Sequence, residues 1–352
     1  MGVCSLYEVS RRCYYSPIAK PIAQPPDLVH IVSHGPHCLD GVTSAVAVAR
    51  FHGGLDVRAH FANNPEINEA IQAIPAPPLG RIAELWITDI SWNQPATDAH
   101  LRALAAAGMR LVWIDHHRTA IERVKRGGVD VPLATMVVED TYAASRLVFE
   151  HLKSRLVAEL RTPSGREEDA ASFLALEKLV ALADDNDRWI HALPGSRELA
   201  LTVGAMHETT AYYELLGVDA DVTYTPVMRE AEARVTAEVA ATHALAEKTR
   251  RERKVGAVTV LAAWCVGYPS EIGDAWGKAL PNAVIALYDT KSAGVSFRRS
   301  PACPVDLSKV AEAFGGGGHA AAAGCKIPGM GERDADALAT LIAGAVRRVT
   351  AS

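Results

Sequence analysis

The sequence predicts an α/β protein with two α/β domains, an N-terminal domain built on a parallel sheet and a smaller C-terminal domain, joined by a long helix. Apolar strand-like runs alternate with helical spacing in the early part of the chain, and a second alternation of this kind closes it. Between them, residues 226–254 contain no glycine and no proline after Pro226, as expected of one continuous helix. A length of 352 residues suits two domains better than one.

These patterns also predict the domain boundaries. We expect a loosely held arm over 1–25, where prolines interrupt a mixed polar stretch. The first domain then covers 26–225, the linker helix 226–254 and the second domain 255–352.

The first domain reads as strands separated by helices. The short apolar runs predicted as strands are 28–33, 57–61, 84–90 and 110–114. The segments with helical spacing are 41–51 and 98–107, the second ending at Gly108. His34, Asp89 and Asp115 come late in or just after apolar runs. Because the carboxyl ends of parallel strands meet at one sheet edge, we expect these three side chains to gather there.

The rest of the chain continues the alternation. Helices are expected over 141–152, 168–183, 271–280, 305–314 and 334–349, and strands over 255–263, 283–288 and 294–298. An acidic stretch, 184–187, follows the second of these helices. Acidic groups are unfavourable at a helix C-terminus, so this stretch is either a solvated turn or a place where a metal ion supplies the counter-charge.

Composition narrows the class of protein. The net charge of −5 argues against a protein that coats long duplex DNA, but it allows a small phosphorylated substrate. The six cysteines form no CxxC pair, which favours a reducing, cytoplasmic compartment. No apolar run reaches the length of a membrane span, and no signal peptide is evident, so we expect no membrane partner.

Carboxylates and imidazoles at predicted strand ends carry the first chemical signal. The set is His34, Asp40, Asp89, Asp115, His116 and Asp185. These are hard or borderline ligands that suit Mn²⁺, Mg²⁺ or Fe²⁺. Two such ions sharing one carboxylate can clamp a phosphate and generate hydroxide. Taken singly, Asp40 is also explained as a helix N-cap, and the pair His116-His117 as one core and one surface histidine.

A glycine-rich string carries the second signal. Residues 314–324 read Phe-Gly-Gly-Gly-Gly-His-Ala-Ala-Ala-Ala-Gly, which combines free backbone N–H groups with one imidazole and can cradle an anion. A flexible turn is the alternative, although consecutive glycines cost backbone entropy that such a turn would not require.

Together the strings occur in a distinctive order: His34 to Gly41, Thr88-Asp89, Asp115-His116-His117, Asp185 to Trp189, and the glycine string. This ordered set resembles the DHH phosphoesterase family with its DHH-associated (DHHA1) C-terminal domain, which includes RecJ exonucleases and nanoRNases. The resemblance covers roughly residues 28–345.

The resemblance implies a ligand set. One metal ion would be held by His34, the side chain at position 38 and Asp89. The other would be held by Asp40, Asp89, His116 and Asp185, with Asp89 as the bridge. In that scheme the catalytic residues are Asp89, His117, which faces the scissile phosphate, and Asp115, which orients the histidines.

The resemblance also implies a substrate-binding group in the second domain. Its members are Gly316, Gly317, Gly318 and His319 in the glycine string, and Ser296 and Arg298 on a neighbouring strand.

Position 38 departs from the family pattern, which is His-x-x-x-Asp-x-Asp, because it holds a cysteine. Cys38 could bind as a thiolate and favour softer metals, His37 could replace it, or the first metal site could be weakened. A modified but functional site is the interpretation that we favour.

The expected function is a metal-dependent phosphodiesterase or exonuclease that hydrolyses short oligonucleotides, or linear dinucleotides such as pGpG, to mononucleotides by a two-metal hydroxide mechanism. Its cofactors would be two divalent ions, Mn²⁺ first and Mg²⁺ second. Its partners would be short single-stranded RNA or DNA, and the family allows a homodimer. The alternatives are a phosphomonoesterase acting on 3′-phosphoadenosine 5′-phosphate, a polyphosphatase or pyrophosphatase, and a nucleotide-binding protein without catalysis.

Overall fold

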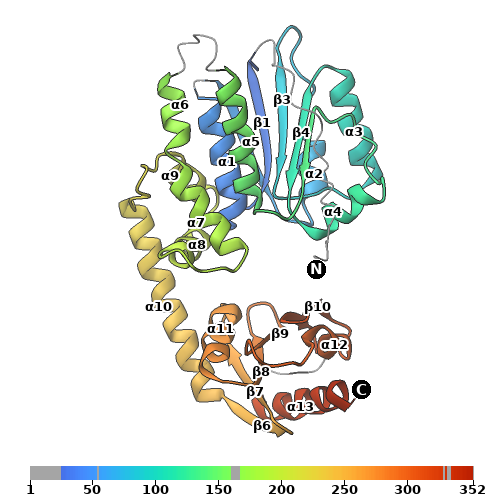
Figure 1. Ribbon diagram of the computed structural model, residues 1–352, viewed down its shortest axis with the longest axis vertical. Helices are drawn as coiled ribbons and strands as arrows, with labels where there is room; N and C mark the ends of the chain where they lie inside the picture. The colour runs from blue at the N-terminus through green and yellow to red at the C-terminus, as the bar shows by residue number, and fades with distance from the viewer. Residues whose placement is uncertain (1–24, 54, 160–166, 328–329, 331–333, 352) are drawn as a thin grey trace, which may run out of the picture. The chain divides into compact units, whose positions relative to one another are not determined.

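The computed structural model describes residues 25–53, 55–159, 167–327, 330 and 334–351. The chain divides into two compact units, Met1–Ala233 and Arg234–Ser352. Helix α10 (Pro226–Thr249) begins in the first unit and continues into the second (Figure 1). The predicted fold class, two α/β domains joined by a long helix, is confirmed. The predicted arm over 1–25 lies outside the described residues, except for residue 25.

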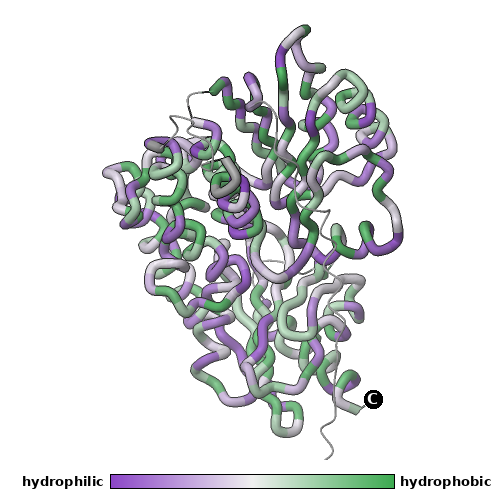
Figure 2. Tube along the Cα trace, turned by 45° about the horizontal axis from the view of Figure 1, so that its top comes forward, coloured by the Kyte–Doolittle hydropathy of each residue, from purple (hydrophilic) through white to green (hydrophobic). Residues whose placement is uncertain are grey.

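The N-terminal unit is built on a five-stranded sheet with the order β2-β1-β3-β4-β5 and parallel pairing throughout. Its strands are β1 (Leu28–His34), β2 (Asp56–Ala62), β3 (Ala83–Thr88), β4 (Arg110–Asp115) and β5 (Thr135–Val138). Strand β3 is buried along its whole length, and β1 and β4 are buried except at one end. Figure 2 shows apolar residues running along these central strands.

Helices cover both faces of this sheet (Figure 1). One face packs against α2 (Ile67–Gln72), α3 (Pro95–Ala106) and α4 (Arg118–Lys125). The other packs against a larger group. That group is α1 (Leu39–Phe51), α5 (Ala144–Glu159), α6 (Glu167–Leu174), α7 (Glu177–Asp187), α8 (Ser196–Ala205) and α9 (Thr210–Leu216). Among them α1 is central, because nearly every residue in it is buried.

The strand order places a switch point between β1 and β3. After β1 the chain adds β2 on one side of it, and after β2 it returns to add β3 on the other side. Ligands of open α/β sheets bind beyond the carboxyl ends of the strands at such a point. His34 ends β1 and Asp89 follows β3, so the topology brings both to this position.

The C-terminal unit contains a six-stranded mixed sheet with the order β10-β11-β9-β8-β7-β6, in which only the β7–β8 pair is parallel. The strands are β6 (Arg251–Val255), β7 (Val258–Cys265), β8 (Ala283–Asp289), β9 (Gly294–Arg299), β10 (Gly317–His319) and β11 (Ala322–Cys325). Helices α12 (Leu307–Glu312) and α13 (Ala335–Ala351) pack on one face. Helix α11 (Pro269–Ala279) packs on the other, where Ala246 of α10 joins its core.

Three predicted elements need correction. The linker helix ends at Thr249 rather than at 254, because Arg251–Val255 pairs with β7 as an antiparallel strand, and this pairing outweighs the helix propensity of Arg, Glu and Lys. The single helix over 168–183 is two helices, α6 and α7. The glycine string, interpreted as an anion cradle or a flexible turn, forms most of a hairpin made by β10 and β11.

No helix in the described part of the chain combines the length and the low charge that crossing a bilayer requires.

The hairpin explains two of the glycines by close packing. A Cβ on Gly316 would lie 2.2 Å from the carbonyl oxygen of Gly324 and 2.5 Å from Cβ of Cys325. Gly318 has φ +142° and would meet Cα of Ala323 at 2.6 Å. A Cβ on Gly317 would meet nothing within 4 Å.

We therefore expect Gly316→Ala to destabilise the C-terminal unit by about 1–3 kcal/mol, because backbone atoms would have to move. Gly317→Ala is the matched control and should change the free energy of unfolding by less than about 0.5 kcal/mol. Urea unfolding of the full chain measures both. Equal midpoints for the two variants would contradict the packing role of Gly316.

A buried charge network stabilises the end of the N-terminal sheet opposite the switch point. Glu84 of β3 is almost wholly buried and accepts a hydrogen bond from Nε1 of Trp86 at 2.9 Å. Its carboxylate lies 3.0 Å from Arg110, 3.4 Å from His52 and 3.9 Å from Arg155. Burial alone would raise the pKa of Glu84, but His52, Arg155 and Trp86 outweigh it and lower that pKa to about 2.

Because the folded-state pKa lies below the ordinary value, ionised Glu84 stabilises the fold at neutral pH, and this contribution is lost as the pH falls from about 4.5 through 2. The loss should be on the order of 3 kcal/mol. Glu84→Gln should lower the stability at neutral pH and flatten the pH dependence in that window. Urea unfolding at several pH values tests this, and a slope equal to that of the wild type would contradict it.

Candidate metal centre

The site begins with the approach of α1 to the end of β1. A Cβ on Gly41 would lie 2.0 Å from the carbonyl oxygen of His34 and 3.0 Å from Oδ2 of Asp89, so only glycine permits this approach. The close contact places Cys38 and Asp40, at the start of α1, beside the carboxyl ends of β1 and β3.

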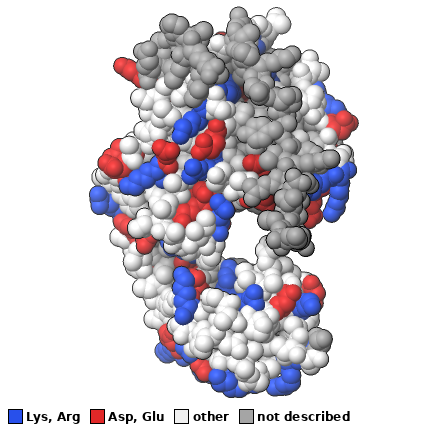
Figure 3. Space-filling model, in the orientation of Figure 1, with Lys and Arg blue, Asp and Glu red and all other residues white. Residues whose placement is uncertain are grey.

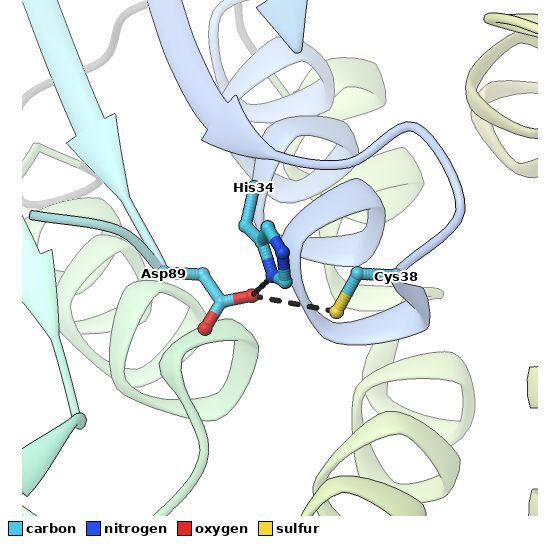
Figure 4. Close-up of side chains that lie close together, drawn as sticks. All are labelled: His34, Cys38 and Asp89. Atoms are coloured by element: carbon cyan, nitrogen blue, oxygen red, sulfur yellow. Dashed lines mark hydrogen bonds and ion pairs between the residues drawn. The ribbon is translucent and has the colours of Figure 1, made fainter. Parts of the chain in front are cut away.

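Asp89 lies at the centre of the site. It follows β3, is 1% exposed and has φ +59°, a left-handed conformation that is uncommon outside glycine. Its Oδ2 lies 3.4 Å from Nδ1 of His34 and 3.6 Å from Sγ of Cys38 (Figure 4). Its Oδ1 lies 3.2 Å from Nε2 of His116 and 3.8 Å from Nδ1 of His117. The two oxygens of one carboxylate therefore face two different groups of ligands.

The second group contains two further carboxylates. Nε2 of His116 lies 3.8 Å from Oδ2 of Asp40 and 3.5 Å from Oδ2 of Asp187. Asp40 is also held by α5, because its carboxylate accepts the backbone N–H groups of Ala144 and Ser145, each at 2.9 Å. Asp40 therefore accepts backbone N–H groups that have no partner inside their own helix. This is the capping role that the N-cap alternative proposed for Asp40, but the helix that it caps is α5 and not α1.

His117 and Asp115 form a supporting pair. Oδ1 of Asp115 lies 2.7 Å from Nδ1 of His117 and accepts the backbone N–H groups of His116 and His117. Its Oδ2 accepts from Ser91 at 2.5 Å. The hydrogen bond that His117 donates to the carboxylate of Asp115 raises the pKa of His117, which favours its cationic form. Asp115 thereby orients both histidines.

The electrostatics of this group call for a cation. Burial, together with Asp89, raises the pKa of Asp40 and of the Cys38 thiol well above their ordinary values. Against the effect of burial, His116 and His34 lower the pKa of Asp89. Oδ1 of Asp89 and Nε2 of His116 are buried and lie 3.2 Å apart, and neither makes a further hydrogen bond among the described residues. Donors of this kind, crowded and incompletely satisfied, fit divalent metal ions.

Three ligand groups emerge, each with its atoms within 4.8 Å of one another. They are His34-Cys38-Asp89, Asp89-His116-His117 and Asp40-His116-Asp187. Between the two candidates for the first site, the structure brings Cys38 into the group, whereas His37 is exposed and lies outside all three.

Asp185 requires a correction, because the structure places it away from this group. Its carboxylate accepts the backbone N–H groups of Ala192 and Leu193 and, at 2.5 Å, the hydroxyl of Ser196. It therefore holds the segment between α7 and α8. Since 184–187 is the last turn of α7 and not a loop, Asp187 points where Asp185 was expected.

A cavity of about 360 Å³ opens beside the centre. Asp89, Asp115, His34 and His117 line it together with residues that no sequence pattern singled out, namely Asn64, Ser91, Asn93, Thr119 and Arg123. Arg123 lines the cavity in a structural role, because its guanidinium is held by other parts of the fold. It binds Asp98 and the carbonyl of Gly128 and lies 4.8 Å from the centre of the Trp92 ring.

The predicted substrate-binding residues of the C-terminal unit lie on adjacent strands. The register places His319, Ala322 and Arg298 in one row across β10, β11 and β9. Ser296 is two residues from Arg298 and accepts a hydrogen bond from it at 3.1 Å. Ser296, Arg298 and His319 therefore share one face of the sheet.

Gly317 and Gly318 lie in β10, next to His319. Gly316 departs from the prediction, because its N–H donates to the carbonyl of Ala311 and is engaged within the fold.

Residues 270–347 match the family model of the DHHA1 domain. The C-terminal unit therefore resembles a DHHA1 domain. No curated protein matches the chain by sequence.

Two solved structures resemble the whole chain. The pGpG-specific phosphodiesterase PggH from Vibrio cholerae aligns over 92% of this chain and 99% of its own, with 14% identity and a TM-score of 0.51. A manganese-bound exonuclease RecJ aligns over 91% of this chain and 90% of its own, with 18% identity and a TM-score of 0.53. At these identities the likeness shows the fold alone, which is an N-terminal parallel sheet and a C-terminal mixed sheet joined by a long helix.

Asp185 and Asp187 give contrasting predictions. Asp185→Asn should destabilise the protein by about 1–3 kcal/mol, because the new amide would face donors, and should leave the metal content unchanged. Asp187→Asn should lose one bound metal ion and change the unfolding free energy of the chelator-treated protein by less than about 1 kcal/mol. Elemental analysis and urea unfolding measure the two effects, and a reversed pattern would restore Asp185 as the ligand.

Proposed function

We propose that the protein is a metal-dependent phosphodiesterase that hydrolyses short oligonucleotides or linear dinucleotides to mononucleotides. The observation that carries this proposal is the carboxylate of Asp89, whose two oxygens face two separate ligand groups at the switch point of a parallel sheet. Such an arrangement suits two divalent ions that share one ligand. The fold likeness to PggH and RecJ agrees with it.

The residues that would hold the ions are His34, Cys38 and Asp89 on one side, and Asp40, Asp89, His116 and Asp187 on the other. When bound, such ions polarise a phosphoryl oxygen and lower the pKa of water. Manganese is the ion we expect first, and magnesium the second.

His117 would act on the substrate directly. Asp115 engages its Nδ1 at 2.7 Å, which leaves Nε2 as the nitrogen available to a phosphate in the adjoining cavity. Because Asp115 favours the protonated ring, His117 can stabilise negative charge that develops on the phosphoryl oxygens.

The size of the cavity supports a small substrate. A volume of about 360 Å³ lies near the lower end of the range for small-molecule sites and suits one nucleotide unit better than a duplex. Figure 3 shows acidic and basic side chains interspersed on the face in view, and the net charge is −5, which does not favour bulk binding to long nucleic acids. Ser296, Arg298, Gly317, Gly318 and His319 of the DHHA1 domain would supply further phosphate or nucleotide contacts.

The test is release of mononucleotide from 5′-labelled di- to pentaribonucleotides and from pGpG, with Mn²⁺, Mg²⁺ or no metal. We expect metal-dependent cleavage that Asp89→Asn reduces at least about 100-fold. Asp130→Asn, which alters a fully exposed carboxylate that belongs to none of the ligand groups, is the matched control and should retain full activity.

Adenosine 3′,5′-bisphosphate and inorganic polyphosphate serve as competing substrates in the same assay. Preferential hydrolysis of either would replace the proposed substrate class. Binding of pGpG without hydrolysis under any metal condition would identify a nucleotide-binding protein instead.

A further inference from the structure

The two halves of the candidate centre differ in their donor atoms. One half offers Nδ1 of His34, Sγ of Cys38 and Oδ2 of Asp89 (Figure 4). The other offers one imidazole and carboxylates only, from His116, Asp40, Asp187 and the second oxygen of Asp89. Thiolate is a soft ligand, whereas carboxylate is a hard one, so the two halves prefer different ions.

The two separations that involve Asp89 in the first half are compatible with a tetrahedral ion. In a tetrahedral zinc site, ordinary bond lengths place neighbouring nitrogen and oxygen ligands about 3.4 Å apart, and neighbouring sulfur and oxygen ligands about 3.6 Å apart. The observed separations are 3.4 Å between His34 and Asp89 and 3.6 Å between Cys38 and Asp89. A right-angled octahedral arrangement would bring each pair to about 3.0–3.1 Å.

The first half also has room for a fourth ligand from outside the protein. It supplies three protein donors, and the His34 side chain is 30% exposed and lines the cavity. Three protein ligands with one open position is the pattern of catalytic zinc, whereas structural zinc is enclosed by four.

Helix formation does not explain the choice of cysteine. Cys38 occupies the N-cap position of α1, where Ser, Thr, Asp or Asn would stabilise the helix better than a thiol does. Its sulfur faces Asp89 (Figure 4).

We infer that the centre is built for two unlike ions: Zn²⁺, or another borderline-soft divalent ion, at His34-Cys38-Asp89, and Mn²⁺ or Mg²⁺ at Asp40-Asp89-His116-Asp187. This inference rests on the two-metal centre of the proposed function. Cys38 is the residue that decides the difference, because each of the other ligands in its group is an imidazole or a carboxylate. On binding, the thiol proton is released to solvent and the sulfur bonds the ion as thiolate.

Cobalt provides a spectroscopic test that does not depend on activity. The full-length protein is stripped with a chelator and titrated with Co²⁺. Thiolate coordinated to Co²⁺ gives a charge-transfer absorption in the near ultraviolet that carboxylate and imidazole ligands do not give. We expect this band to saturate at about one Co²⁺ per chain. The band should be lost in Cys38→Asp and Cys38→Ser.

Control variants show whether the band comes from Cys38 or from another cysteine. Cys303→Ser, which changes a buried cysteine of the C-terminal unit, should keep the band, and so should the double change Cys4→Ser and Cys13→Ser. Cys38→Asp has a family-like ligand at position 38 and should still bind two ions, so loss of its band reports coordination and not unfolding. A band that persists in Cys38→Asp, or that never forms in the wild type, would overturn the inference.

Metal selection gives the second readout. Because Zn²⁺ binds nitrogen and oxygen ligands more tightly than Mn²⁺, the competition requires Mn²⁺ in large excess over Zn²⁺. After equilibrium dialysis against such a mixture, elemental analysis should find more Zn²⁺ per chain in the wild type than in Cys38→Asp. The same metal ratio in both proteins would contradict a deciding role for Cys38. If metal binding follows the expectation but no oligonucleotide is hydrolysed, the proposed function fails while the unequal centre stands.

Discussion

The carboxylate of Asp89 is the constraint on which the rest of the centre depends. It can face His34 and Cys38 with one oxygen and His116 with the other only because it follows a buried strand at the point where the strand order reverses. The left-handed backbone at Asp89 is the local cost of this orientation. The flanking strands, buried on both faces, provide a rigid support for it.

Three of the candidate ligands reach this carboxylate from the ends of helices, two from a helix N-terminus and one from a helix C-terminus. At its N-terminus, α1 approaches β1 closely because residue 41 is glycine, and so Cys38 and Asp40 reach the site. At its C-terminus, α7 presents Asp187, although acids are unfavourable there. A divalent cation would remove that penalty together with the repulsion among Asp40, Asp89 and Asp187.

Much of this arrangement was predictable from sequence, and the failures have identifiable causes. Buried strands such as 28–34 and 110–115 carry long apolar runs, and the ordered His and Asp strings pointed to the correct sheet edge. The choice of Asp185 followed from the family resemblance, whereas in the structure Asp187, in the last turn of α7, is the residue that contacts His116. In a helix, a shift of two residues turns a side chain by about 200° to another face. Strand β6 was missed because its charged residues favour a helix locally, and only pairing with β7 reveals it. Asn64 and Asn93 carry no pattern of their own, since they meet only when the cavity forms.

Asp40 and Asp187 differ in a way that matters for comparing relatives of this chain. Asp40 anchors the first turn of α5 as well as facing the candidate metal site, so a related chain without the proposed activity would still need it to fold. Asp187 is held in the site by its contact with His116 and supports no helix in this manner. Retention of Asp40 in another sequence therefore indicates only an intact scaffold, whereas retention of Asp187 is the better marker that selection still acts on the chemistry.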